Sequence, residues 1–351
     1  MDATDPLRAH LLSGQVIPAH PLALTEARRL DEPYQRALTR YYVDAGAGGI
    51  AVGVHTTQFG IRDRQHGLLE PVLALAAESS RHALGARPRP FVRVAGVCGR
   101  GDQALREASL AAQLGYDAAL VSLADFAHED DTIMLGHVRR VADVLPVFGF
   151  YLQPAVGGRT LDYGFWHEFA GIERVVAVKI APFDRYRTFD VVRAIADAGR
   201  DDIALYTGND DAIVADLVTP VATPRGTRRI AGGLLGQWAM WTSRAVELLG
   251  AVHAAHASGS IPTTLLRRGA ALTDANGAIF DAGHGFAGCL SGIHEVLRRQ
   301  GLLRGTWCLD PGEMLSPGQR ESIDRVLATA AAEGLSDDEF VAERLDDWLR
   351  P

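Results

Sequence analysis

The sequence predicts an α/β fold, a (β/α)8 or TIM barrel with a C-terminal helical extension. Short apolar runs alternate with longer stretches of helical period from residue 15 onward, as in repeated strand–helix units around a parallel sheet. There are eight such runs, whereas an open doubly wound sheet usually has about five to seven strands. The chain of 351 residues is long enough, because one barrel takes about 250 residues.

The predicted strands are short runs, mostly apolar, as expected for parallel strands covered on both faces. They cover residues 15–18, 49–54, 91–97, 118–122, 146–151, 174–179, 203–206 and 229–231. The predicted helices lie between them and carry apolar side chains at three- and four-residue spacing. Clear examples cover residues 34–45, 103–115, 132–144, 190–198 and 238–256. Glycine is typical of helix C-termini, and three of these helices close on Gly46, Gly115 and Gly199.

The pattern changes after residue 256, where helices follow one another without strands. These helices are predicted over residues 263–272, 286–299, 317–332 and 337–349. We therefore predict a barrel domain over residues 13–256 and a helical appendage over residues 257–351.

The charge balance argues against nucleic acid or a membrane surface as a partner. The chain has 35 basic and 43 acidic residues and a net charge of −8, which repels phosphate backbones and anionic lipids. The sequence lacks an apolar run of eighteen residues and does not begin like a signal peptide. From the sequence we expect a cytoplasmic protein.

The cysteines and histidines give no metal-binding pattern. Cys98, Cys289 and Cys308 are far apart and include no closely spaced pair, so neither a disulfide framework nor a zinc site is expected. His55 has no second histidine at metal-ligand spacing. We therefore predict no metal and no cofactor.

The strongest candidate for a catalytic residue is Lys179, which lies near the end of the sixth predicted strand among Val and Ile residues. The active sites of (β/α)8 barrels lie at the carboxyl ends of the strands. Lys179 is the one lysine among the 35 basic residues, and the others are arginines. Burial lowers the pKa of a lysine, and a neutral amine can attack a carbonyl carbon to form a Schiff base. A structural lysine that reaches a surface carboxylate is the alternative.

A tyrosine ends the preceding strand. Neighbouring strands lie about 4.8 Å apart, so we expect Tyr151 and Lys179 to reach the same bound carbonyl carbon. The phenol of Tyr151 could then transfer protons as a general acid and base. A core tyrosine with a satisfied hydroxyl group is the structural alternative.

The second predicted strand is followed by Thr56 and Thr57. Their hydroxyl groups and the backbone N–H groups of this turn could bind a carboxylate without an arginine, and a threonine hydroxyl could relay a proton. Two glycine-containing turns are more ambiguous. Gly232, Gly233 and Gly236 could hold a phosphate or form a tight turn, and residues 208–211 could begin the next helix as caps.

The sequence resembles the dihydrodipicolinate synthase / N-acetylneuraminate lyase family of class I aldolases. The residues that carry the resemblance are, in chain order, 53–57, Tyr151, Lys179 and 206–210. The resemblance covers nearly the whole chain, including the C-terminal helices, and depends on order and spacing. It implies a (β/α)8 barrel, commonly a homotetramer, whose lysine forms an imine with pyruvate or a related 2-oxo acid.

The resemblance also implies a role for each matching residue. Lys179 is similar to the Schiff-base lysine, Tyr151 to the proton-transferring phenol and Thr56 to the relay hydroxyl. The residues similar to the substrate-binding positions are Thr57 for the carboxylate of the 2-oxo acid and Gly208 and Ile230 as lining of the pocket.

Two departures from the family pattern are informative. The synthase proper carries an arginine for the carboxylate of its second substrate, and here Val156 falls at that position while Arg159 comes three residues later. An apolar residue there would leave a buried carboxylate unpaired, so aspartate semialdehyde is not expected as a substrate. The tyrosine that a neighbouring subunit contributes to the hydroxyl relay corresponds to Phe126.

We therefore predict a Schiff-base lyase or aldolase that acts on pyruvate or a related 2-oxo acid, with an aldehyde as a candidate second substrate and with a homo-oligomeric assembly. A hydratase or decarboxylating dehydratase of the same family would use the same imine and stays open. A barrel that has lost catalysis and binds a small effector is the alternative from another class. A metal-dependent aldolase is not expected, because no set of metal ligands converges at the strand ends.

Overall fold

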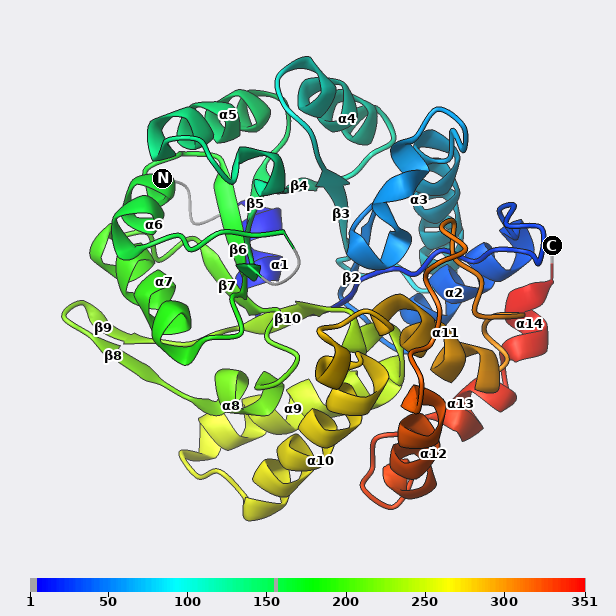
Figure 1. Ribbon diagram of the computed structural model, residues 1–351. Helices are drawn as coiled ribbons and strands as arrows, with labels where there is room; N and C mark the ends of the chain where they lie inside the picture. Colours follow the sequence, from blue (N-terminus) through cyan, green and yellow to red (C-terminus); the bar gives the residue numbers. More distant parts are fainter. Residues whose placement is uncertain (1–4, 155–156, 351) are drawn as a thin grey trace. The chain divides into compact units, whose positions relative to one another are not determined.

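The computed structural model describes residues 5–154 and 157–350. The chain divides into two compact units that interleave along the sequence. The first unit comprises Met1–Gln15 and Pro90–Leu234, and the second comprises Val16–Arg89 and Leu235–Pro351. Figure 1 follows the alternation of strands and helices along the chain.

The first unit contains most of the parallel strands. These are β3 (Val92–Val97), β4 (Ala118–Val121), β5 (Val147–Leu152), β6 (Val175–Ala181), β7 (Ala204–Thr207) and most of β10 (Gly232–Leu235). Its helices are α1 (Pro6–Leu12), α4 (Asp102–Gln113), α5 (Asp131–Val144), α6 (Tyr163–Ala170), α7 (Arg185–Asp197) and α8 (Ile213–Val218). A short antiparallel hairpin, β8 (Val221–Thr223) and β9 (Gly226–Arg228), precedes β10.

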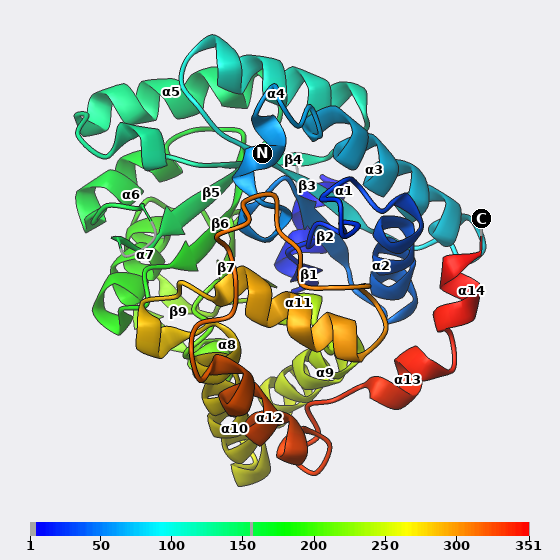
Figure 2. The same cartoon turned by 45° about the vertical axis from the view of Figure 1, so that its right-hand side comes forward.

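The second unit contains the first two strands, β1 (Val16–Pro18) and β2 (Gly49–Val52), with α2 (Glu32–Asp44), α3 (Leu69–Gly85) and α9 (Thr242–Ser258). Its C-terminal helices are α10 (Thr263–Ile279), α11 (Cys289–Arg299), α12 (Gln319–Ala330), α13 (Asp338–Ala342) and α14 (Leu345–Leu349). Figure 2 shows α10 beside α12 and α14 beside α2. The indole of Trp348 in α14 donates a hydrogen bond of 2.7 Å to the carboxylate of Asp44 at the end of α2.

The sheet confirms the predicted (β/α)8 barrel. Its eight strands follow the order β1-β10-β7-β6-β5-β4-β3-β2. The strands at the two ends of this order also meet, since a parallel bridge joins Ala19 to Ala51 and the N–H of His20 donates to the carbonyl of Ala51 at 2.8 Å. The first seven predicted strands are confirmed to within two residues at each end. The three predicted C-cap glycines have positive φ angles, 91° at Gly46, 82° at Gly115 and 70° at Gly199.

The prediction for the eighth strand is wrong. Residues 229–231 precede the strand, which spans Gly232–Leu235, so Gly232 and Gly233 lie inside a strand and not in a turn after one. Glycine is required here for close packing, because a Cβ atom at Gly232 would lie 2.4 Å from the carbonyl oxygen of Gln15. The two glycines interrupted the apolar run that sequence analysis uses to find a strand.

The C-terminal helices confirm the predicted helical extension. Residues 235–351 lie in the same compact unit as β1 and β2. The predicted domain boundary after residue 256 stays a prediction. Among the described residues, no helix is both long and apolar enough to cross a membrane.

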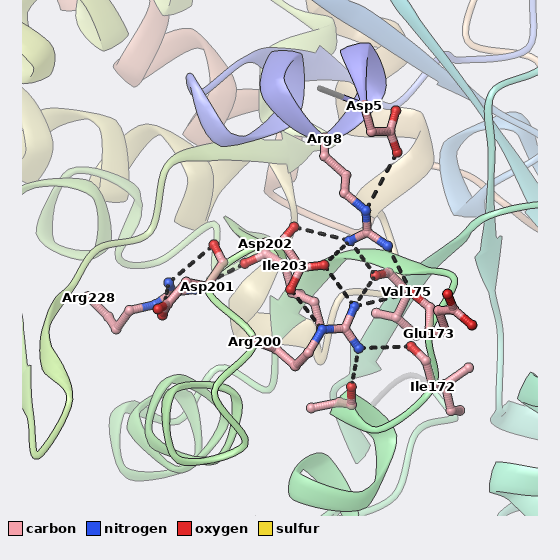
Figure 3. Close-up of polar contacts among 11 residues, drawn as sticks. Asp5, Arg8, Ile172, Glu173, Val175, Arg200, Asp201, Asp202, Ile203 and Arg228 are labelled. Carbon is pink, nitrogen blue, oxygen red and sulfur yellow. Dashed lines mark hydrogen bonds and ion pairs between the residues drawn. The ribbon is translucent and has the colours of Figure 1, made fainter. Parts of the chain in front are cut away.

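An arginine network closes the amino-terminal ends of β6 and β7 (Figure 3). Arg8 of α1 forms an ion pair of 2.6 Å with Asp202, and Arg200 forms a second ion pair of 2.7 Å with the same carboxylate. The two guanidinium groups also donate to the backbone carbonyls of Glu173, in the loop before β6, and of Val175, the first residue of β6. Every buried charge in this network therefore has a partner.

Candidate active site

The carboxyl-terminal half of β6 carries Lys179. In the parallel register, Lys179 pairs with Phe150 of β5 on one side and with Tyr206 of β7 on the other. Side chains alternate between the two faces of a strand, so these three residues share one face. The Nζ atom of Lys179 lies 4.6 Å from the centre of the Phe150 ring. The amine thus lies against an aromatic face, with the buried Val178 and Ile180 beside it in the chain.

The surroundings of Lys179 favour its neutral form. Burial lowers the pKa of its amine to about 8, against a smaller opposite effect of the Asp210 carboxylate. With this pKa, about a tenth of the amine is neutral at pH 7, which is roughly two to three hundred times more than for an ordinary lysine. Lys179 can therefore act as a nucleophile near neutral pH.

Gly208, at the end of β7, lies directly against the lysine side chain. A Cβ atom at this position would lie 2.7 Å from Cε of Lys179 and 2.8 Å from Cβ of Ala181. The N–H of Gly208 donates a hydrogen bond of 2.7 Å to the carbonyl of Ile180, which fixes this close approach. The structure therefore brings together two of the residues predicted from the sequence, Lys179 and Gly208.

A buried network holds the loops after β6 and β7. The Asn209 side chain accepts a hydrogen bond from the N–H of Phe183 at 2.9 Å and donates to Thr188 at 3.0 Å and to Asp216 at 2.9 Å. Asp216 also accepts a hydrogen bond of 2.7 Å from the hydroxyl of Thr207. Burial raises the pKa of Asp216, and the hydrogen bonds from Asn209 and Thr207 oppose that shift. The network fixes the backbone on both sides of Gly208.

Tyr151 does not meet Lys179, in contrast to the sequence prediction. It follows Phe150 on β5, so its side chain belongs to the opposite face of the sheet. Its ring lies 5.3 Å from that of Trp166 in α6, and its hydroxyl accepts a hydrogen bond of 3.1 Å from the N–H of Leu161. Burial raises the pKa of this phenol. The prediction counted strand ends and overlooked the alternation of side chains.

Thr56 and Thr57 lie in a 3-10 turn, His55–Thr57, directly after β2 in the second unit. Both hydroxyl groups donate to the carbonyl of His20, at 3.3 Å from Thr56 and 2.7 Å from Thr57. The Thr57 oxygen also accepts a hydrogen bond of 3.0 Å from the N–H of Gly53. Thr57 therefore stabilises the turn itself, and its action on a substrate carboxylate stays a prediction, as does the relay role of Thr56.

Ile230 lies before β10. The register of β10 against β7 pairs Gly232 with Tyr206, so Ile230 is two residues closer to the amino end than the level of Lys179. This position corrects the prediction that Ile230 lines the pocket at the carboxyl ends of the strands. The same error that misplaced the eighth strand misplaced this residue.

Two of the residues that depart from the family pattern, Arg159 and Phe126, have defined contacts in the structure. Arg159 forms an ion pair with Asp131 and donates a hydrogen bond of 2.6 Å to the carbonyl of Glu129, so its guanidinium group is already engaged. The ring of Phe126 lies under the guanidinium of Arg100, 4.7 Å from its central carbon. Val156 lies outside the described residues.

Sequence analysis missed two residues of the site, Phe150 and Asp210. Phe150 precedes Tyr151 by one position on β5, and the register with β6, which the sequence alone does not fix, places Phe150 at the level of Lys179. Asp210 was noted only as a candidate helix cap. Within the described residues, no group of three or more His, Cys, Asp or Glu side chains could hold a metal ion.

No protein-family model matches the chain, and no curated protein matches it in sequence. The fold is similar to that of several solved structures. A prophage protein of the dihydrodipicolinic acid synthase family from E. coli K12, in complex with pyruvate, has a TM-score of 0.72 at 17% identity, over 92% of this chain and 99% of that one. Dihydrodipicolinate synthase from Oceanobacillus iheyensis has a TM-score of 0.71 at 17% identity, over 93% and 100% of the two chains.

A third similar structure is N-acetylneuraminate lyase from Fusobacterium nucleatum complexed with pyruvate, with a TM-score of 0.70 at 16% identity, over 92% of this chain and 98% of that one. At these identities the comparison establishes a shared fold. The shared fold agrees with the (β/α)8 barrel that the sequence predicts.

Proposed function

We propose that this protein is a Schiff-base-forming lyase of the class I aldolase type that acts on pyruvate or a related 2-oxo acid. The observation that carries the proposal is the position of Lys179, the one lysine of the sequence, in the carboxyl-terminal half of a barrel strand. Burial there lowers the pKa of its amine and so favours the neutral form. Two solved structures of similar fold are described as complexes with pyruvate, which supports a 2-oxo acid as substrate.

In the proposed reaction, Nζ of Lys179 attacks the keto carbon of the 2-oxo acid, and loss of water gives an imine. The imine takes up a proton and then accepts the electron pair of the neighbouring carbon–carbon bond, while the departing fragment loses its hydroxyl proton and leaves as an aldehyde. The product on Lys179 is an enamine, which takes up a proton and is hydrolysed to release the 2-oxo acid. Gly208 leaves room for the lysine side chain. Thr57 would bind the carboxylate of the 2-oxo acid and Thr56 would relay a proton, as the resemblance implies.

A hydratase or decarboxylating dehydratase would form the same imine and would break a carbon–oxygen or carbon–carboxylate bond instead. Analysis of products from a panel of 2-oxo acids distinguishes these reactions. The position of Tyr151 beside Trp166 favours a second candidate function, a barrel that binds a 2-oxo acid as an effector without catalysis.

Trapping with borohydride tests the proposal. The protein is incubated with pyruvate, reduced, digested and analysed by mass spectrometry. Because Lys179 is the one lysine, the N-terminal α-amine is the other primary amine that could react, and the two peptides are easily distinguished. We expect the adduct on the Lys179 peptide and no adduct there in Lys179→Arg. Binding of pyruvate without an adduct on Lys179 would support the effector-binding barrel and overturn the enzyme.

A further inference from the structure

The turn after β7, residues 208–211, is held by a side chain from within the next helix. Sequence analysis left open that the polar residues of this turn cap that helix. In the structure α8 begins at Ile213, its N-cap residue is Ala212, and no side-chain hydrogen bond caps it. The residues at the start of the turn are instead tied to Asp216 of α8. The helix therefore holds the turn.

Asp216 is a buried acid in a short helix whose other residues are all apolar. Its Oδ2 atom accepts hydrogen bonds of 2.7 Å from the Thr207 hydroxyl and 2.9 Å from the Asn209 amide, and its Oδ1 atom forms an ion pair with Arg185. Burying a carboxylate costs free energy unless such partners compensate it, and an apolar side chain would pack here without that cost. The contacts of the carboxylate therefore indicate why an acid occupies this position.

The two partners of Oδ2 lie on either side of Gly208. The Thr207 hydroxyl donates to Asp216 and also accepts a hydrogen bond of 3.1 Å from the N–H of Asn209, which closes the chain around Gly208. A Cβ atom at Gly208 would lie 2.7 Å from Cε of Lys179, so the backbone there touches the lysine side chain. Every link from Asp216 to the lysine is therefore a direct contact.

Asn209 extends this hold to the loop after β6. Its Nδ2 atom donates to Asp216 and, at 3.0 Å, to the hydroxyl of Thr188, so its oxygen faces the N–H of Phe183 and accepts from it at 2.9 Å. Phe183 has a φ angle of 55°, which residues other than glycine rarely adopt. Asp216 thus fixes the amide that holds the loop just after the strand of Lys179.

We propose that Asp216 is a positioning residue, which holds Gly208 against the side chain of Lys179 and so places the amine for attack on the 2-oxo acid. The proposal rests on the proposed Schiff-base function. Asp216 acts through its hydrogen bonds to Thr207 and Asn209 and needs no contact with the substrate. A shift of about 1 Å in a reacting group is enough to slow a reaction by about 10²-fold.

The test compares a variant that removes the hydrogen-bond acceptor with one that keeps it. Asp216→Leu has no acceptor, whereas Asp216→Asn keeps one oxygen that can accept from Thr207 and Asn209. Full-length protein is mixed with pyruvate at pH 7 and quenched with borohydride after increasing times, and the adduct on the Lys179 peptide is quantified. We expect Asp216→Leu to slow adduct formation by about 10²-fold and Asp216→Asn to stay close to the wild-type rate.

A second variant tests the path from Asp216 to the lysine. Thr207→Val removes the hydroxyl that donates to Asp216 and accepts from Asn209, with little change in shape. We expect it to slow adduct formation by about tenfold, and we expect the double variant to be no slower than Asp216→Leu, because both changes break the same path. If Asp216→Leu does not fold, Thr207→Val carries the test, and a wild-type rate in it would overturn the proposal.

The resonance of the one lysine reports its position without any substrate. In protein labelled with ¹³C at the lysine Cε carbon, we expect Asp216→Leu to raise the pH at which Lys179 titrates, because a loosened turn lets water solvate the charged amine. The titration of Asp216→Asn should match that of the wild type. Val218→Ala is the matched control, because it removes a buried apolar contact from the same helix. It should lower the melting temperature and leave both the adduct rate and the titration unchanged.

The outcomes separate positioning from stability and from the reaction itself. An Asp216→Leu variant with a lower melting temperature but a wild-type rate and titration would overturn the proposal and leave Asp216 a structural residue. A large loss of rate in Asp216→Asn would overturn it as well, because the charge would then matter and not the acceptor. A rate in Val218→Ala as low as that in Asp216→Leu would have the same meaning for the helix as a whole. Absence of any adduct in the wild-type protein would instead overturn the proposed function, and the resonance would still test the position of the lysine.

Discussion

Positive charge is stabilised at the amino-terminal ends of β6 and β7 and destabilised in their carboxyl-terminal halves. At the amino-terminal ends, Arg8 and Arg200 share the carboxylate of Asp202 and donate to several backbone carbonyls (Figure 3). Burial alone would raise the pKa of Asp202, but the hydrogen bond from Arg200 and the charges of Arg200 and Arg8 lower it. In the carboxyl-terminal half, Lys179 lies against Phe150, and burial lowers its pKa to about 8.

The difference shows which end stabilises the fold and which end is suited to chemistry. A buried cation with partners for all its donors contributes to one defined structure, and losing it leaves its partners unpaired. A partly buried cation with little compensation destabilises its own charged form, which is the property required of a nucleophilic amine. The predictions below separate these two properties, from the largest expected effect to the smallest.

Replacing Lys179 should remove activity without loss of stability. We expect Lys179→Met to lower the rate of 2-oxo acid turnover by at least about 10⁴-fold, because the group that forms the covalent intermediate is gone. The melting temperature should stay the same or rise, since a poorly compensated charge is removed. Calorimetry and steady-state kinetics on the same sample measure both. A variant that keeps its activity would contradict the assigned role of Lys179.

Replacing Arg200 should have the opposite effect. Arg200→Met leaves the Asp202 carboxylate and the carbonyls of Ile172 and Val175 without these donors, and we expect a loss of about 3 kcal/mol in the free energy of unfolding. Adduct formation with pyruvate should persist below the new melting temperature. Arg193→Met is the matched control, since Arg193 forms an exposed ion pair with Asp190. Equal stability of the two variants would show that the network is not stabilising.

A side chain at position 208 should displace the amine. The Cβ atom of Gly208→Ala would lie 2.7 Å from Cε of Lys179 and 2.8 Å from Cβ of Ala181, so the lysine must move. We expect the rate of imine formation to fall by about 10²-fold, as is typical for a nucleophile shifted by about 1 Å. The stopped-flow or quench rate with pyruvate measures this. A wild-type rate would show that the lysine adapts without cost. Gly250→Ala serves as the control, since a Cβ atom there meets no atom within 4 Å.

The smallest predicted effect is a dependence of stability on pH. Burial lowers the pKa of Lys179 in the folded protein from its ordinary value of 10.5 to about 8. Between these pH values the unfolded chain binds more protons than the folded chain, so this residue makes stability rise with pH across the window. Denaturant titrations of the wild type and Lys179→Met should therefore converge as the pH rises from 8 to 10.5. Parallel curves would mean that the lysine is not perturbed.

The sequence predicted the barrel well because its strands are continuous apolar runs separated by helices with clear periodicity. It failed at β10, where Gly232 packs closely against the backbone of Gln15 and, together with Gly233, interrupts the apolar run. It found Lys179 and Gly208, but the face on which a side chain points requires strand register. A shift of one residue exchanges Phe150 and Tyr151 between the two faces, and no local property of the sequence fixes this. Asp210 was noted only as a candidate helix cap, because its electrostatic effect on Lys179 involves the neighbouring strand.

The most direct test of the account is the titration of the Lys179 amine itself. Because the sequence contains one lysine, protein labelled with ¹³C at the lysine Cε carbon gives one resonance, which can be followed by NMR from pH 6 to 11. A titration midpoint near pH 8 in the free protein, and a change in this resonance on addition of pyruvate, would agree with a buried nucleophilic amine. A midpoint near the ordinary lysine value of 10.5, with no response to pyruvate, would contradict it.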